Sequence, residues 1–189
     1  LIPPCHSRES GHPVILHELI ETLQKLLQMP KSVWVTMKVI YEKEVEAARI
    51  VVSPRPAWKC RVCPMYGKSP SCPPHVPLWK ETRDWIKCFQ RAVIVKVETD
   101  RSNYEGEKRE AITCLLKKEK DFFVKGCPFA FALFPGNCNL CEECGFETDK
   151  KCPYPTRVRP SVNAVGIEIS SFVKIDFCED VLYGLIMVD

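Results

Sequence analysis

Four cysteines lie within fifteen positions of one another in the stretch GNCNLCEECGFETDKKCPYP, residues 136–155. Three of them form the pattern C-x-x-C-x-x-C, and the fourth follows after a gap of seven residues as a Cys-Pro pair. Thiolates at this spacing can surround one compact inorganic centre, and proteins of the bacterial ferredoxin kind use the same run to hold an iron-sulfur cluster. The candidate ligands are Cys138, Cys141, Cys144 and Cys152.

Two kinds of metal centre suit these four thiolates. Ferredoxins have a three-residue gap before their final Cys-Pro pair, whereas the gap here has seven residues, so Cys152 can complete the same cluster or serve another centre. Zinc sites more often use two separated C-x-x-C pairs. We therefore expect a [4Fe-4S] cluster at this motif, with zinc as the alternative.

A second group of cysteines lies upstream in WKCRVCPMYGKSPSCPPHVP, residues 58–77. Cys60, Cys63 and Cys72 supply three thiolates within a proline-rich stretch, a pattern that indicates metal ligation rather than core packing. Their fourth ligand is open: His75 would complete a Cys3His zinc site, Cys152 could be shared, or a non-protein ligand could occupy the position. The chain is accordingly expected to carry one or two metal centres.

The remaining five cysteines are isolated in the sequence and are not expected to be ligands. Cys88, Cys114, Cys127 and Cys178 are expected to be small apolar side chains, and Cys5 is expected to lie on a flexible terminus. With 12 cysteines in 189 residues and no recognisable secretory signal, the chain is expected to be cytoplasmic with reduced thiols. It has no run of about 18 apolar residues, so no membrane association is expected.

The formal net charge is only +3, so nucleic acid is not expected as a partner. Basic residues nevertheless gather around Cys152, namely Lys150, Lys151, Arg157 and Arg159. They are interpreted either as an ordinary solvated loop or as cations that tune a cluster and dock an acidic redox partner protein. The oligomeric state is left open.

The regular elements alternate between helix and strand. An amphipathic helix is predicted within residues 14–28, as part of an N-terminal helix and arm at 1–30 that precedes an α/β metal-binding domain at 31–189. Strands are predicted at 33–41, 92–98, 127–134 and 181–188, and helices at 78–90, 105–126 and near 161–169. The prolines of 53–77 argue against any helix or central strand there.

This alternation predicts the α/β class, with a single domain built on a small mixed sheet, helices packed on it, and two cysteine-rich metal-binding loops. Such loops leave the ends of regular elements, where sites usually lie.

The motifs together resemble an uncharacterised bacterial and archaeal family described as predicted metal-binding proteins. The resemblance rests on C-x-x-C-x-x-Y-G-K-S-x-x-C-P-P from Cys60 to Pro74, on C-x-L-C-x-x-C from Cys138, and on R-P-S-x-x-A-x-G-I from Arg159. It implies that the metal ligands are Cys60, Cys63, Cys72, Cys138, Cys141, Cys144 and Cys152. It implies no particular reaction.

Three functions remain open on the sequence. The first is an iron-sulfur redox or electron-relay protein, favoured by the C-x-x-C-x-x-C spacing and by the lack of nucleotide-binding, zinc-protease and serine-hydrolase motifs. The second is a zinc-stabilised interaction module. The third is an enzyme in which the centre at Cys60, Cys63 and Cys72 keeps an open position for a substrate.

Overall fold

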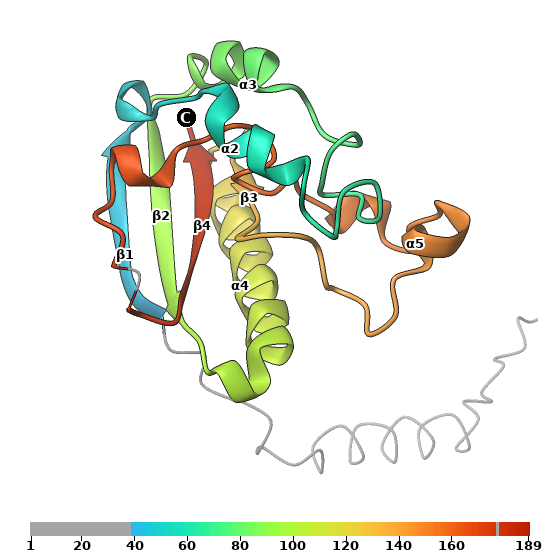
Figure 1. Cartoon of the computed structure of the whole chain (residues 1–189). Coiled ribbons are helices and arrows are strands. Elements are labelled where there is room, and N and C mark those ends of the chain that lie inside the picture. The colour runs from blue at the N-terminus through green and yellow to red at the C-terminus, as the bar shows by residue number, and fades with distance from the viewer. Residues whose placement is uncertain (1–38, 177) are drawn as a thin grey trace, which may run out of the picture. The chain divides into compact units, whose positions relative to one another are not determined.

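The computed structural model describes residues 39–176 and 178–189. The helix predicted within 14–28, most of the strand predicted at 33–41, and Cys5 lie outside these residues. The described part confirms the α/β class: helices pack on one small sheet in a single compact domain (Figure 1).

The sheet has four strands: β1 (Val39–Glu46), β2 (Arg91–Glu98), β3 (Phe131–Leu133) and β4 (Val181–Val188). Their order is β1-β2-β4-β3, and each neighbouring pair is antiparallel, so the expectation of a mixed sheet was wrong. The reason is the position of β4. Strands β2 and β3 run parallel to each other and are joined by a helical crossover, α4 (Tyr104–Val124), but β4 lies between them.

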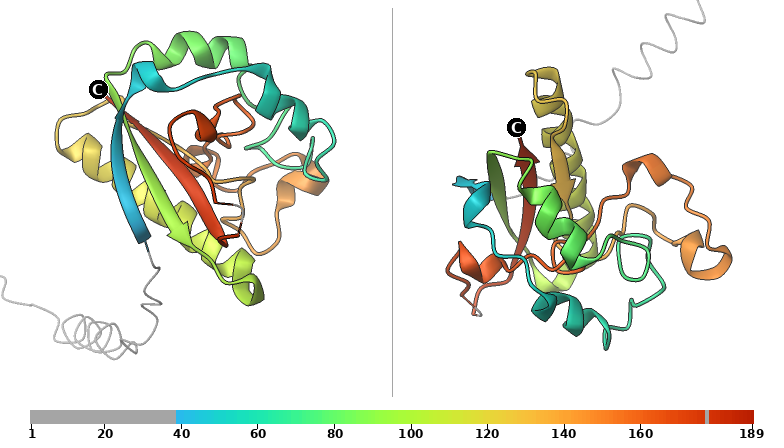
Figure 2. Two further views of the ribbon diagram at one scale, coloured as in Figure 1. Left: turned by 60° about the vertical axis from the view of Figure 1, so that its left-hand side comes forward. Right: turned by 90° about the horizontal axis from the view of Figure 1, so that it is seen from above.

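Helix α4 covers one face of the sheet (Figures 1 and 2). Its buried residues Ala111, Ile112 and Leu115 pack against Val93, Val95 and Val97 of β2 and against the same face of β4. The approach is close at Gly184, where an added Cβ would lie 2.4 Å from Cδ1 of Leu115. Glycine in β4 therefore lets the crossover helix sit directly on the sheet.

The opposite face of the sheet is covered by α3 (Trp79–Ile86) and by residues 161–176. Ile94 of β2, Leu185 of β4 and Leu133 of β3 point to this side and pack with Ile86. Both faces of β2 and β4 are thus buried, which explains why these strands are almost continuously apolar.

Two local predictions were wrong. The proline-rich stretch begins with a helix, α2 (Pro54–Cys60), because its prolines occupy the first turn, where no backbone N–H donor is required and Ser53 caps the end. Residues 161–168 form turns rather than a helix. Their ends bridge to other segments, Ser161 to Phe134 and Ile167 to Val52, and these pairings take the place of helical hydrogen bonds.

Candidate metal centre

The two groups of cysteines lie on loops that contact each other. The first cysteine loop runs from Cys60, at the end of α2, to His75, and the second runs from Gly136 to Tyr154 and contains the short helix α5 (Gly145–Asp149). Both lie on the same side of the sheet, on the right in Figure 1. Cys60 is the last residue of α2, and the other six candidate ligands lie outside helices and strands.

Several side chains join the two loops. The ammonium of Lys150 donates to the carbonyl of Gly67 at 2.9 Å, and Lys68 pairs with Glu147 at 3.1 Å. The ring of His75 meets the ring of Phe146 edge-on, with centroids 4.9 Å apart. The loops consequently form one continuous region of structure.

Hydrogen bonds of buried serine side chains also link the two loops. Ser69 and Ser71 are buried, and their hydroxyl oxygens are 2.9 Å apart. The hydroxyl of Ser71 also accepts a hydrogen bond from the backbone N–H of Cys138 at 2.6 Å. A buried donor needs such a partner, so Ser71 holds the first residue of the C-x-x-C-x-x-C motif in place.

The four cysteines of the second loop line one small cavity. Its other walls are formed by Pro70, Asn139, Leu140, Pro153, Tyr154 and Val158. Helix α5 begins after Cys144 and ends at Asp149, and the next residue, Lys150, adopts a left-handed conformation with φ of 58°. The seven-residue gap is therefore one helical turn with a reversal, and it returns Cys152 to the cysteines of its own loop.

Burial and mutual repulsion act on these thiols. The pKa of Cys138 is raised to about 11, chiefly by burial and to a smaller extent by the neighbouring thiolates of Cys144, Cys152 and Cys141, while a hydrogen bond from the backbone of Leu140 opposes the rise. The pKa of Cys141 is raised as well, first by burial and then by Cys144 and Cys152. A raised pKa favours the neutral thiol, so these cysteines need a nearby cation, such as a bound metal centre, to become thiolates.

The first loop gathers its own three cysteines. Burial raises the pKa of Cys60, and the thiolates of Cys72 and Cys63 raise it further. Cys72 is buried, and although burial raises its pKa, the hydroxyls of Ser71 and Ser69 oppose this effect. Cys152 interacts with the second set, so the sharing of Cys152 between the two sets, considered from the sequence, is not favoured.

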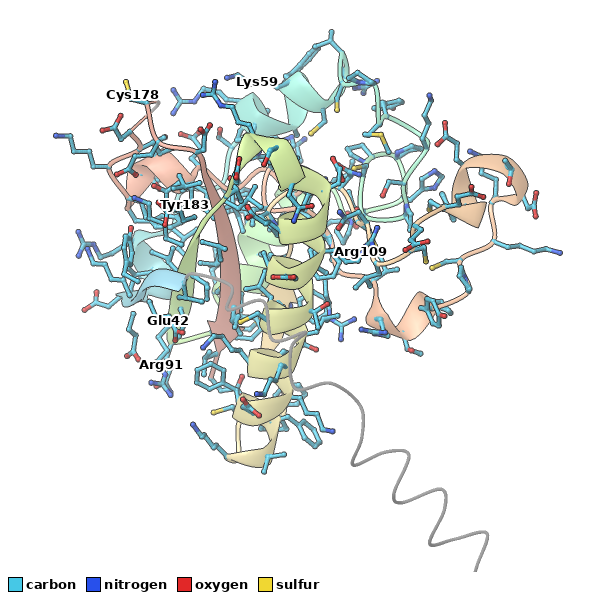
Figure 3. All side chains as sticks on the ribbon, turned by 90° about the horizontal axis from the view of Figure 1, so that it is seen from below. Glu42, Lys59, Arg91, Arg109, Cys178 and Tyr183 are labelled. Atoms are coloured by element: carbon cyan, nitrogen blue, oxygen red, sulfur yellow. The ribbon has the colours of Figure 1, made fainter. Side chains whose placement is uncertain are left out.

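Helix α4 supplies two residues to this region that the motif analysis did not single out. The ammonium of Lys108 is buried and donates to Oδ1 of Asn137 at 2.7 Å. Nε of Arg109 donates to the carbonyl of Asn139 at 3.0 Å, and Figure 3 shows Arg109 on the side of α4 next to this loop. Lys108 had a signal in the sequence, because it precedes Ile112 by four residues and shares its helical face.

The basic residues around Cys152 have different roles. The guanidinium of Arg159 pairs with Glu119 of α4 at 2.5 Å and stacks on the ring of Phe131, 5.0 Å from its centroid. Arg157 lies over Tyr154, and Lys150 holds the first loop as described above. Arg159 is thus part of the packing and is not a free element of a docking surface.

The isolated cysteines that the structure describes are free thiols. Cys88 and Cys178 are exposed, and Cys114 and Cys127 are partly buried. Figure 3 places Cys178 well away from the loop that carries α5. Their expected absence from the ligand set stays a prediction.

The candidate ligands are soft sulfur donors. Among residues 39–176 and 178–189, no three His, Cys, Asp or Glu side chains converge closely enough to hold a single ion. The four cysteines of the second loop line a cavity. Thiolates are soft ligands that select zinc, copper(I) or iron-sulfur centres over magnesium or calcium, so the donor chemistry fits the group that the sequence predicts.

Comparisons with known proteins give one match. No curated protein and no solved structure matches the chain. Within the described residues, no helix combines the length and apolar character needed to cross a bilayer. A family model described as "Predicted metal-binding protein (DUF2284)" matches residues 43–177, which include both cysteine loops. This match confirms the resemblance seen in the motifs. The chain therefore belongs to the DUF2284 family of predicted metal-binding proteins.

Proposed function

We propose that this protein is an iron-sulfur redox protein that carries a [4Fe-4S] cluster on Cys138, Cys141, Cys144 and Cys152. The observation that carries the proposal is that these four cysteines, and no others among the described residues, line the cavity of the second loop. A complete set of four thiolates is what a cubane cluster requires.

The spacing of the sulfurs favours a cluster over zinc. A single zinc ion draws each sulfur to about 2.3 Å, so its four ligands must converge on one point. A cubane core of iron and sulfide lies between its thiolates and keeps them farther apart. Three of the four thiolates here come from one contiguous C-x-x-C-x-x-C run, as in ferredoxins, rather than from two separated C-x-x-C pairs, which supports the cluster.

The bound cluster would supply reversible one-electron chemistry. The chain itself holds the site with Ser71 and Arg109, which fix the backbone of the motif, and shields it with Leu140 and Tyr154. All four cysteines are only partly buried, so an electron can pass from a reduced partner protein to the site and on to an oxidised acceptor. Exposed Lys151 and Arg157 offer cations for docking such a partner.

A second candidate function involves the first loop. Cys60, Cys63 and Cys72 influence one another, whereas Cys152 belongs to the other set and His75 packs on Phe146. Three thiolates without a fourth cysteine leave a coordination position for a substrate, so this centre could act as a Lewis acid or a one-electron donor in an enzyme.

The metal content of oxygen-free protein tests the proposal. We expect iron and acid-labile sulfide in equal amounts, with about four irons per chain for one cubane and about eight for two. Zinc without iron would instead support the interaction module, and protein with neither metal would refute both readings.

A pair of variants assigns the cluster to the second loop. Cys152→Ala should abolish the paramagnetic signal of the cluster on that loop and remove about four irons, whereas Cys178→Ala, at an exposed cysteine elsewhere, should keep the wild-type content. Equal iron content in the two variants would contradict the assignment. If a second cubane is present, Cys72→Ala should remove it and leave the first.

A further inference from the structure

A cavity of about 340 Å³ lies between helix α2, the first cysteine loop and the start of α3. Its walls include Trp58 of α2, Tyr66 of the loop, Trp79 of α3 and Ala164 from the turns at 161–168. This volume falls in the range of small-molecule sites and is far larger than a single water needs. None of the seven candidate metal ligands lines it, and it shares no residue with the cavity of the second loop.

The walls of this cavity are aromatic and apolar. Trp58 is 70% exposed and Leu78 is 67% exposed, so the free protein presents large apolar side chains to water around the hollow. Exposed apolar surface gathered in one place marks an interaction site, because covering it with an apolar ligand is favourable. Tryptophan and tyrosine rings stack best on another flat ring, in offset or edge-to-face geometry. The lining therefore favours a planar aromatic ligand.

The charge around the cavity is positive. Arg61 is the one charged residue among the described residues that line it, and its guanidinium lies 5.9 Å from the ring centroid of Tyr66. Outside the lining, the ammonium of Lys80 and the guanidinium of Arg83 each lie 5.7 Å from the ring centroid of Trp79. A ligand with one negative group would thus meet cations, and no carboxylate of the described residues lines the cavity to oppose it.

The walls are held in place by contacts within the protein. The backbone N–H of Gly67 donates to the carbonyl of Pro73 at 2.9 Å and closes the part of the loop that carries Tyr66. Trp79 packs against Gly166, where an added Cβ would lie 2.6 Å from Cβ of Trp79. Four of the lining residues are prolines, whose φ is fixed. A preformed site of this kind binds its ligand with a small loss of conformational entropy.

We propose that this cavity binds a small planar aromatic carboxylate, whose ring packs on Trp58 and Trp79 and whose carboxylate pairs with Arg61. One guanidinium presents two parallel N–H donors, and these match the two oxygens of a carboxylate. The site needs no metal on either loop and is therefore independent of the proposed redox function.

The experiment is a calorimetric titration of the full-length protein at pH 7 with three probes. The first, 2-naphthoate, has both the flat ring and the carboxylate. The second, 2-naphthamide, keeps the ring and removes the charge. The third, 1-adamantanecarboxylate, keeps the charge and replaces the flat ring with a globular cage. Together they separate the contribution of the ring from that of the carboxylate.

Two variants assign the binding to the cavity. Arg61→Met keeps the apolar stem and removes the charge, and Arg49→Met makes the same change at an exposed arginine outside the lining. Trp58→Ala removes one aromatic wall, and Phe129→Ala removes a similarly exposed ring, 74% exposed, that does not line the cavity. Because Arg61 and Trp58 are exposed, neither substitution opens a hole in the core.

We expect 2-naphthoate to bind wild type at least about tenfold more tightly than either other probe. Arg61→Met should weaken the binding of 2-naphthoate about tenfold and leave that of 2-naphthamide unchanged. Trp58→Ala should weaken the binding of both naphthalene probes, and the two controls should match wild type.

Two results would overturn this assignment. The ligand class is wrong if 2-naphthoate shows no saturable binding, or if it binds wild type no more tightly than 2-naphthamide or 1-adamantanecarboxylate. The site is wrong if Arg61→Met binds 2-naphthoate as Arg49→Met does, or Trp58→Ala as Phe129→Ala does. The comparison of the three probes on wild type decides the ligand class even where a variant fails to fold.

Discussion

The backbone N–H of Cys138 donates a 2.6 Å hydrogen bond to the hydroxyl of Ser71, and this bond joins two loops that are 67 positions apart in the chain. Ser71 is fully buried, and its own carbonyl accepts from the backbone N–H of Ser161 at 3.0 Å. One residue of the first cysteine loop therefore holds both the start of the C-x-x-C-x-x-C motif and the turn that follows Arg159. The geometry of each cysteine loop depends on the other.

Substitution of Ser71 tests this dependence. Ser71→Ala leaves the N–H of Cys138 buried without its acceptor, and we expect the free energy of unfolding to fall by about 1–3 kcal/mol. Denaturant unfolding of the metal-free protein measures the change, with Ser170→Ala, at an exposed serine, as the control. We also expect Ser71→Ala to lose cluster more rapidly in the presence of a chelator. Equal stability of the two variants would show that the bond contributes little.

The bounds of helices and strands were predicted well in segments with a clear apolar periodicity, where burial alone decides the structure. The strand predicted at 181–188 coincides with β4, the strand at 92–98 differs from β2 by one residue, and the helix at 105–126 from α4 by at most two at either end. Each is long and has a clear apolar pattern. Their order in the sheet was not predictable, because packing against α4 and α3 decides that β4 pairs between β2 and β3.

The sequence predicted which cysteines are candidate ligands, but it did not predict how they are arranged in space. Spacing alone left open whether Cys152 joins its own loop or the other, since the answer depends on α5 and on the left-handed conformation of Lys150. Ser71 gave no signal, because a serine between two prolines suggests only a loop. Lys108 did give one, since a lysine on the apolar face of a helix must find a buried partner.

The Arg159 and Glu119 pair is expected to stabilise the fold. Both side chains are largely buried, at 17% and 15% exposure, so Arg159→Met should leave a poorly compensated carboxylate and lower the free energy of unfolding by about 2–4 kcal/mol. Arg157→Met, at an exposed arginine two residues away, should change it by less than about 0.5 kcal/mol.

A double-mutant cycle separates this pair from a docking role. The double variant Glu119→Gln with Arg159→Met should lose at least about 1 kcal/mol less unfolding free energy than the sum of the losses in the two single variants. Additive losses, together with a weaker affinity for a redox partner in Arg159→Met, would contradict the structural role and restore Arg159 to the docking surface.

Glu168 should make the free energy of unfolding depend on pH in the acidic range. Hydrogen bonds from Arg55 and then from Ser53 hold the pKa of its carboxyl below the ordinary value. Because the folded-state pKa is depressed, the unfolded chain binds the proton more readily. The contribution of Glu168 is therefore complete above the unfolded pKa of about 4.3 and is lost as the pH falls through the folded value.

The Glu168→Gln variant is accordingly expected to be less stable than wild type at pH 7, and the difference should shrink as the pH is lowered from about 5 to about 3. Unfolding curves across this range measure it, and Glu46→Gln, at an exposed glutamate, supplies the control for the loss of one carboxylate. A constant difference between wild type and Glu168→Gln over the whole range would exclude this titration as its cause.

Gly166 carries the most demanding backbone position near the first loop. Its φ is +84°, and an added Cβ would lie 2.6 Å from both the carbonyl oxygen of Ser53 and Cβ of Trp79. Gly126 has a similar φ of +95° but has open space at the same place. Alanine should therefore cost about 1–2 kcal/mol of unfolding free energy at Gly126, from backbone strain alone. At Gly166 the clash raises the expected cost to about 2–5 kcal/mol.

The clash is also expected to affect metal binding at the first cysteine set. The carbonyl of Gly166 accepts the backbone N–H of Ser53 at 2.8 Å, and Ser53 caps α2, whose last residue is Cys60. Displacement of Ser53 in Gly166→Ala should therefore move α2 and lower metal occupancy at Cys60, Cys63 and Cys72, while the set on the second loop keeps its metal. Metal analysis of the Gly166→Ala and Gly126→Ala proteins distinguishes the two effects, because only the former should lose metal. Equal occupancy in both would mean that α2 can adjust to the added methyl group without moving Cys60.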